Sequence, residues 1–176
     1  DSRGEPTIEA EIRNKEGKAF RAQVPSGKSR GSREASVFSY LDAKAAFEKI
    51  LKPRFLGQTL ASIAEFDDLA RNLDRTEEKR MLGGNVALSF SIAVSRGIAD
   101  EKKCEVWELL REEFFRTERG AHPPRIFSNF INGGAHARNN LDIQEYLVLS
   151  PHGMLPSKAT AALIELYHIL GEKLGK

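Results

Sequence analysis

The chain has 176 residues and 40% hydrophobic residues, enough to bury a core in one domain or in one domain and part of a second. Its 27 basic and 25 acidic side chains leave a formal charge of +2, so no strong field favours nucleic acid. The single cysteine, Cys104, excludes an intrachain disulfide, and no apolar run reaches the roughly 20 residues that span a membrane. We therefore expect a cytoplasmic protein that binds neither nucleic acid nor a membrane.

The amino-terminal segment predicts an antiparallel hairpin. Residues 7–13 alternate apolar and polar side chains, which is the period of a half-buried strand. The sequence NKEG at residues 14–17 predicts a turn, and residues 18–24 form the second arm. The polar, glycine-containing stretch at residues 25–32 then predicts a surface loop.

Residues 34–115 predict a run of helices. Apolar residues between positions 37 and 50 follow helical spacing, and Pro53 is expected to end that helix. A second apolar series covers residues 60–73. A further helix with little charge, residues 86–98, follows a Gly-Gly-Asn sequence and is expected to be buried on most sides.

The last helix of this run, residues 106–115, is expected to be short and amphipathic. Its expected core face carries three side chains: Trp107, Leu109 and Leu110. We also expect Trp107 and the pair Phe114 and Phe115 to be core or interface aromatics.

A Gly-Ala-His-Pro-Pro segment predicts a boundary between an α+β domain, residues 1–119, and a second part, residues 120–176. The second part reads as two short strands, residues 126–131 and 143–149, and a last helix over residues 157–175.

Two motifs in this second part contain groups that transfer protons. NFINGGAHA at residues 129–137 brings His136 onto a loop after two glycines, and LDIQE at residues 141–145 ends in Glu145. The two groups could lie close together at the opening of one site and act in acid–base chemistry. The alternative is an ordinary glycine turn followed by a surface histidine.

Four blocks of sequence carry a resemblance to a known family. They are DSRGEPTIE at residues 1–9, VPSGKSRG at 24–31, LGGN at 82–85 with the helix after it, and the paired NGGAHA and LDIQE motifs within 132–145. In this order they resemble the enolases, the phosphopyruvate hydratases that interconvert 2-phosphoglycerate and phosphoenolpyruvate in glycolysis. The sequence LYH at residues 166–168 adds to the similarity.

The resemblance implies the α+β fold class. The expected architecture is an enolase-like amino-terminal domain, an antiparallel β-sheet followed by a helical bundle, leading into an incomplete TIM-type barrel. The first two strands and the first helix of that barrel would lie in this chain.

The resemblance also implies roles for four residues. Glu145 matches the first of two glutamates that assist the departure of hydroxide, and Gln144 matches a substrate-contacting glutamine. His136 matches a loop histidine that moves against the substrate phosphate. Ser29 matches the loop serine that reaches the second Mg²⁺ when its loop closes. Lys28 and Arg30 replace the family's usual alanine and threonine beside it.

The resemblance implies Mg²⁺ as cofactor, but the carboxylates for the first Mg²⁺, the lysine base and the second catalytic glutamate match no position in this chain. We therefore expect a lyase only when the remaining barrel is supplied, and no activity of the chain alone. The hypothesis is that a separate carboxyl-terminal chain supplies it. In place of that second chain, the exposed barrel strands could pair by self-association. The alternative functions are a non-catalytic enolase-like binding or assembly protein and a piece of a full-length enolase.

Overall fold

The computed structural model of the protein describes residues 1, 3–27, 31–115, 124–134 and 137–175. The chain forms two compact units, Asp1–Thr117 and Glu118–Lys176. The predicted boundary between residues 119 and 120 lies outside the described residues, so its position stays a prediction. Within the described residues, no helix combines the length and the apolar character that a membrane crossing requires.

The first unit begins with an antiparallel hairpin of β1 (Ile8–Arg13) and β2 (Ala19–Val24), as predicted. Gly17 has a positive φ of 82° in the turn and donates its N–H to the carbonyl of Asn14, with 3.0 Å between N and O. The hairpin buries Ala10 and Ala22 on one face and exposes charged side chains on the other.

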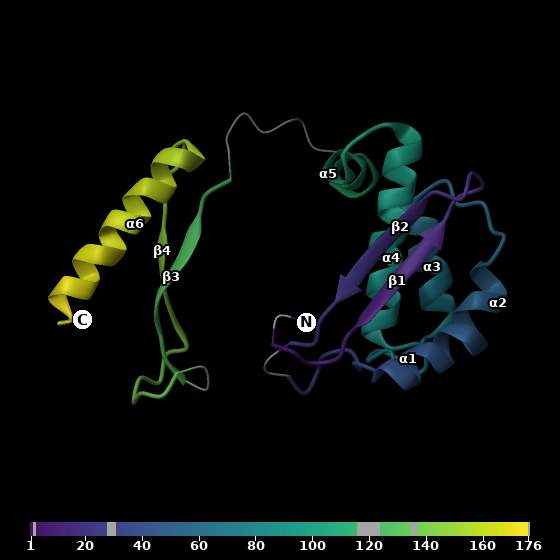
Figure 1. Ribbon diagram of the computed structural model, residues 1–176, viewed down its shortest axis with the longest axis horizontal. Coiled ribbons are helices and arrows are strands. Elements are labelled where there is room, and N and C mark those ends of the chain that lie inside the picture. The colour runs from purple at the N-terminus through teal and green to yellow at the C-terminus, as the bar shows by residue number, and fades with distance from the viewer. Residues whose placement is uncertain (2, 28–30, 116–123, 135–136, 176) are drawn as a thin grey trace. The chain divides into compact units, whose positions relative to one another are not determined.

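Helices pack on the buried face of the hairpin (Figure 1). The central one is α4 (Gly84–Lys102), which contacts both strands and α3. The other helical segments of the unit are α1 (Tyr40–Ala46), η1 (Phe47–Leu51), α2 (Lys52–Phe55), α3 (Ile63–Leu73), α5 (Val106–Leu110) and η2 (Arg111–Phe115). The prediction of a largely buried helix after Gly-Gly-Asn is confirmed, because nine residues of α4 are buried.

The core lies between α4 and the helices on its far side. The rings of Phe47 and Phe90 stack with centroids 5.0 Å apart, and Phe55 meets the edge of Phe66 at 5.3 Å. Leu51 is also fully buried. Removing such large side chains from water is the main stabilising contribution to this unit.

The prediction that Pro53 ends a helix is wrong. The chain stays helical from α1 through η1 and α2 to Phe55. In the π-helical segment η1, the N–H of Lys52 donates to the carbonyl of Phe47, five residues back. This wider turn directly precedes Pro53 and accommodates both its ring and its missing N–H.

The assignment of Trp107 to the core face is also wrong. Trp107 is 56% exposed and lies against the Arg111 guanidinium, 5.3 Å from the ring centroid, whereas Leu109 is fully buried. Residues two apart on a helix do not share a face, so Leu109 and Trp107 cannot both point into the core. Phe114 and Phe115 are exposed as well, so the first unit does not use them in its core.

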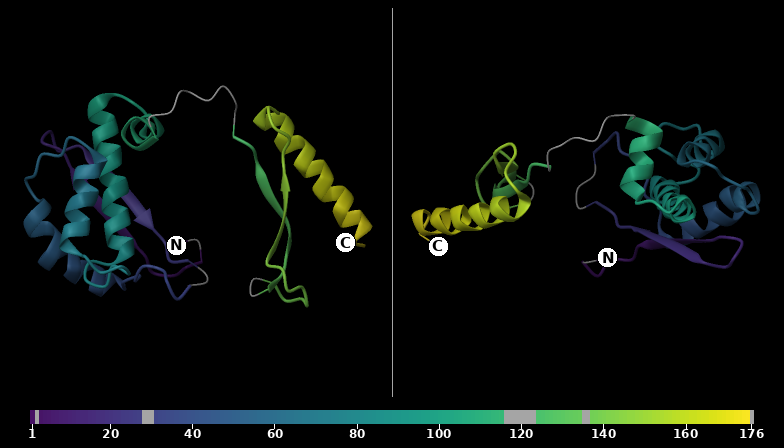
Figure 2. Two further views of the ribbon diagram at one scale, coloured as in Figure 1. Left: turned by 180° about the vertical axis from the view of Figure 1, so that it is seen from behind. Right: turned by 90° about the horizontal axis from the view of Figure 1, so that it is seen from above.

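The second unit contains a hairpin of β3 (Phe127–Asn132) and β4 (Glu145–Leu149), followed by α6 (Pro156–Lys173). The two strands pair antiparallel with an irregularity at Phe130, whose ring meets the edge of Tyr167 of α6 at 5.7 Å. The helix runs along one side of the hairpin (Figure 2). The α+β class is thus confirmed, and the described strands form two small sheets and no closed barrel.

Candidate functional site

The register of β3 and β4 brings the two ends of the loop 133–144 together. Asn132, the last residue of β3, lies opposite Glu145, the first residue of β4. Because the strands are antiparallel, the end of one and the start of the other lie at the same end of the hairpin. The loop that carries the NGGAHA motif therefore begins next to Glu145.

Two glycines allow this close approach. Gly133 donates its N–H to the carbonyl of Gln144 with 2.9 Å between N and O, and Gly134 donates to Leu141 at 2.7 Å. A Cβ on Gly133 would lie 2.2 Å from the carbonyl oxygen of Ile143, a distance that no real contact shows. Gly134 is needed for another reason, since its φ is +58°.

Gly133→Ala should therefore disrupt the end of the hairpin. We expect a cost of about 1–3 kcal/mol, as for other overpacking substitutions, and loss of the Gly133 to Gln144 hydrogen bond. Backbone amide exchange in the intact protein measures this at residues 133 and 146. Asn140→Ala is the matched control, because Asn140 is an exposed residue of the same loop and its truncation adds no atom near the carbonyl of Ile143. Equal amide protection in the two variants would contradict the steric argument.

Of the four predicted site residues, the structure describes Gln144 and Glu145. Both side chains are exposed, and the carbonyl of Gln144 accepts the bond from Gly133. The backbone at the start of β4 places the Cα of Glu145 opposite Asn132. His136 and Ser29 lie outside the described residues, as do Lys28 and Arg30, so their roles stay predictions.

The two ends of the loop that contains Ser29 are held by charged side chains. The Arg3 guanidinium donates to the carbonyl of Ser26 and pairs with the carboxylate of Asp1 at 3.2 Å. At the other end, the carboxylate of Glu34 accepts from the N–H of Gly31 with 2.8 Å between O and N. Sequence reasoning missed Arg3 and Glu34, because both bond to backbone atoms and leave no side-chain pattern.

Asn85 holds the segment that follows this loop. It is buried, its side-chain oxygen accepts from the N–H of Phe38 and its amide donates to the carbonyl of Phe38, both at 3.0 Å. Gly84 donates to the carbonyl of Ser36 at 2.8 Å, and a Cβ there would lie 2.6 Å from Cβ of Ala35. The LGGN sequence therefore holds residues 35–38 close to the start of α4, in addition to starting this helix.

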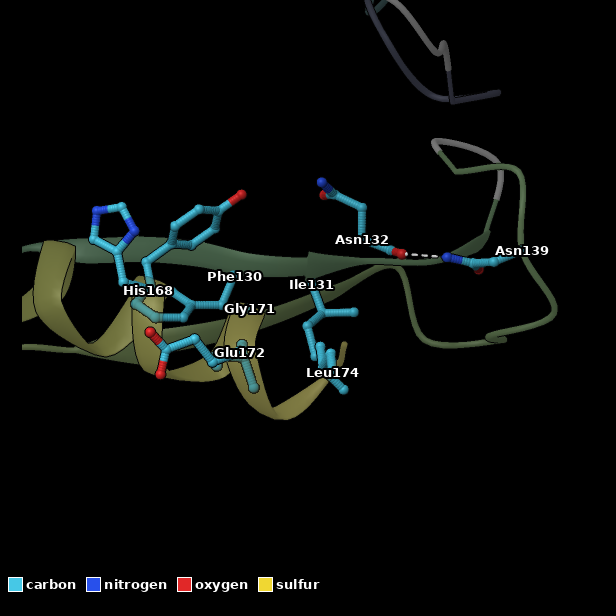
Figure 3. Close-up of a pocket in the computed structure, with 10 residues that line it drawn as sticks. Phe130, Ile131, Asn132, Asn139, His168, Gly171, Glu172 and Leu174 are labelled. Carbon is cyan, nitrogen blue, oxygen red and sulfur yellow. Dashed lines mark hydrogen bonds between the residues drawn. The ribbon is translucent and has the colours of Figure 1, made fainter. Parts of the chain in front are cut away.

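A pocket of about 530 Å³ lies in the second unit between β3 and α6 (Figure 3). Phe130, Asn132 and Asn139 line its hairpin side, and His168 and Glu172 are among the residues that α6 contributes. Asn132 and Asn139 connect this pocket to the loop beside Glu145.

The described residues do not form a metal centre. Nowhere in residues 1, 3–27, 31–115, 124–134 or 137–175 do three histidine, cysteine or carboxylate side chains gather as ligands. Octahedral Mg²⁺ is usually held by one or two carboxylates with water and substrate oxygens. A Mg²⁺ ion held in this way needs fewer protein carboxylates than such a group provides, so the binding of Mg²⁺ stays a prediction.

The two units define a protein in which an α+β domain precedes a strand–loop–strand–helix segment with a carboxylate at its loop end. Comparison with known families finds two family models that match this chain. Residues 1–110 match the family described as "Enolase, N-terminal domain", and residues 122–176 match "Enolase, C-terminal TIM barrel domain". The chain belongs to the enolase family.

Relatives in several organisms are named enolase. The chain is 38% identical over 185 residues to one from Methanopyrus kandleri and 32% identical over 186 residues to one from Ureaplasma parvum. It is 33% identical over 190 residues to one from Bdellovibrio bacteriovorus. These alignments cover at least 99% of this chain but 42–43% of each relative, so the chain spans less than half the length of these relatives.

Proposed function

We propose that this chain provides part of the active site of a phosphopyruvate hydratase, which converts 2-phosphoglycerate into phosphoenolpyruvate and water. The observation that carries the proposal is the β3–β4 register, which puts the exposed Glu145 beside the glycine-containing loop of the NGGAHA motif. Membership of the enolase family supports the same reaction.

In the proposed reaction, the protonated Glu145 carboxyl gives its proton to the hydroxyl group on C3 of the substrate. The C3–O bond breaks, water leaves and Glu145 remains as a carboxylate. The proton on C2 goes to a base that belongs to the remaining barrel, and the electron pair of the C2–H bond forms the C2=C3 double bond. General acid catalysis of this kind contributes about 10²–10⁴-fold to a rate.

The other proposed roles rest on the family resemblance. Gln144 contacts the substrate, His136 approaches its phosphate, and Ser29 reaches a second Mg²⁺. The metal would stabilise negative charge that develops on the substrate. The carboxylates that hold the first Mg²⁺ belong to the remaining barrel in this proposal.

The proposed partner is the rest of an enolase-type barrel. In the second unit Phe127 is 64% exposed and Leu147 is 50% exposed, and Ile164 and Ile169 of α6 are exposed too. Ala159 is the one apolar side chain classed as core among the described residues of this unit. Two strands and a helix with so little core need further strands to cover these faces. Those strands come from a second polypeptide in this proposal.

The test is to purify the tagged protein from its host in buffer with Mg²⁺ and to follow phosphoenolpyruvate formation from 2-phosphoglycerate. Intact masses are measured on the same sample. Turnover together with a second chain of barrel size supports the proposal. Turnover from a single longer chain supports the reaction and contradicts the two-chain assembly. A folded protein without turnover would instead favour a non-catalytic binding or assembly role.

A further inference from the structure

Asn139 makes two hydrogen bonds across the narrow part of the loop 133–144. Its side-chain amide donates to the carbonyl of Asn132 with 2.9 Å between N and O, which Figure 3 shows as a dashed line. Its side-chain oxygen accepts from the N–H of Leu141 at 3.1 Å. One side chain thus joins the last residue of β3 to the returning part of the loop.

Further backbone hydrogen bonds connect this part of the loop to Glu145. Asn132 is the strand partner of Glu145. The carbonyl of Leu141 accepts from Gly134 at 2.7 Å, and the carbonyl of Gln144 accepts from Gly133 at 2.9 Å. Residues 139–145 are therefore held against the end of β3 by a continuous set of hydrogen bonds, of which the Asn139 side chain contributes two.

We propose that Asn139 is a positioning residue that holds Glu145 in its reactive geometry. The inference rests on the proposed function. The pairing with Asn132 sets where the Glu145 side chain leaves the backbone, and a displacement of about 1 Å at a reacting group can cost up to about a hundredfold in rate.

Asn139 is itself exposed, so its removal can change the position of Glu145 without a large change in the stability of the whole unit. Exposed hydrogen bonds contribute little to global unfolding, because water replaces them in the open state. Loss of this side chain should then loosen the loop locally. The adjacent exposed Asn140 makes neither of these two bonds and provides a matched control.

The experiment compares Asn139→Ala, Asn139→Asp and Asn140→Ala in the complete enzyme as its host makes it. We expect Asn139→Ala to lower kcat about tenfold while KM changes less than about twofold, with faster exchange of the Gly134 and Leu141 amides. Asn139→Asp keeps the acceptor for Leu141 but turns a carboxylate oxygen toward the carbonyl of Asn132. This variant should keep the Leu141 amide protected from exchange and still have a lower kcat than the unsubstituted enzyme. Asn140→Ala should match the unsubstituted enzyme in all readouts.

Three results would overturn the inference. They are unchanged amide exchange in Asn139→Ala, an unchanged kcat in Asn139→Asp, and an equal loss of kcat in Asn140→Ala. Failure of the proposed function is distinguished by Glu145→Gln. If that variant retains full turnover, Glu145 has no role in the reaction, whatever the amides near Asn139 show, and positioning of Glu145 is overturned with it.

Discussion

Glu145→Gln is expected to lower kcat of the complete enzyme by about two to three orders of magnitude. Glutamine has nearly the same shape as glutamic acid, but its amide does not give up a proton to the departing hydroxyl group. Because the side chain is exposed at the start of β4, the substitution leaves the hairpin and its apolar faces unchanged. KM and the association of this chain with the rest of the barrel should therefore change little.

Asp142→Asn is the matched control. It removes the same charge from an exposed position in the same LDIQE motif, and no transfer of a proton is assigned to it. Turnover by the two variants is measured in the same purified assembly, with the yield of co-purified barrel as the check on association. Turnover of the Glu145 variant within a few-fold of the unsubstituted enzyme would end the assigned role. An equal loss in the Asp142 variant would show that charge, and not proton transfer, is responsible.

The elements that the sequence predicted correctly are those with a regular period or a local signal. The alternation in residues 7–13 predicted β1, the turn after it predicted β2 as the second arm, and the Gly-Gly-Asn sequence predicted the start of α4. Pro53 was misjudged because a local rule about proline takes no account of the π-helical turn before it. Trp107 was misjudged because hydrophobicity alone does not say which side of a short helix faces the core.

The site was predictable at a coarser level. The NGGAHA and LDIQE motifs predicted a loop next to a carboxylate, and the register of Asn132 and Glu145 agrees with that arrangement. The side chains that shape the loops were missed. Asn139, Asn85 and Arg3 bond to backbone groups that the fold brings near. Every residue type has a backbone carbonyl, so no pattern of side chains in the sequence identifies such a partner.

Asp74 was missed for the same reason, and its replacement should destabilise the first unit. Asp74 lies in the segment that joins α3 to α4 and is fully buried. One carboxylate oxygen accepts from the N–H of Thr76 at 3.1 Å and from its hydroxyl. The other accepts from the N–H of Met81 at 2.9 Å and of Leu82 at 2.7 Å.

Asp74→Asn places an amide N–H₂ group where one carboxylate oxygen accepts two bonds. Two buried donors then face a donor, so we expect a loss of roughly 2–4 kcal/mol in the free energy of unfolding at pH 7. Urea denaturation measures this. Asp68→Asn is the control, since Asp68 is an exposed carboxylate of α3 with a surface pair to Arg71, and its loss should have no measurable effect.

The pH dependence separates the charge of Asp74 from its shape. Burial alone would raise the pKa of Asp74, but the hydrogen bonds from Thr76, Leu82 and Met81 outweigh it and hold the pKa below its ordinary value. A lowered pKa in the folded state contributes stability that is fully present above the unfolded pKa of about 3.9 and is lost as the pH falls through the folded pKa. The difference in unfolding free energy between the unsubstituted protein and Asp74→Asn should therefore be constant from pH 7 to about pH 5 and shrink below about pH 4. A difference that stays the same down to pH 2 would mean that the substitution acts through packing. Protonating the carboxyl group would then leave the difference in unfolding free energy unchanged, so the charge of Asp74 would not be its cause.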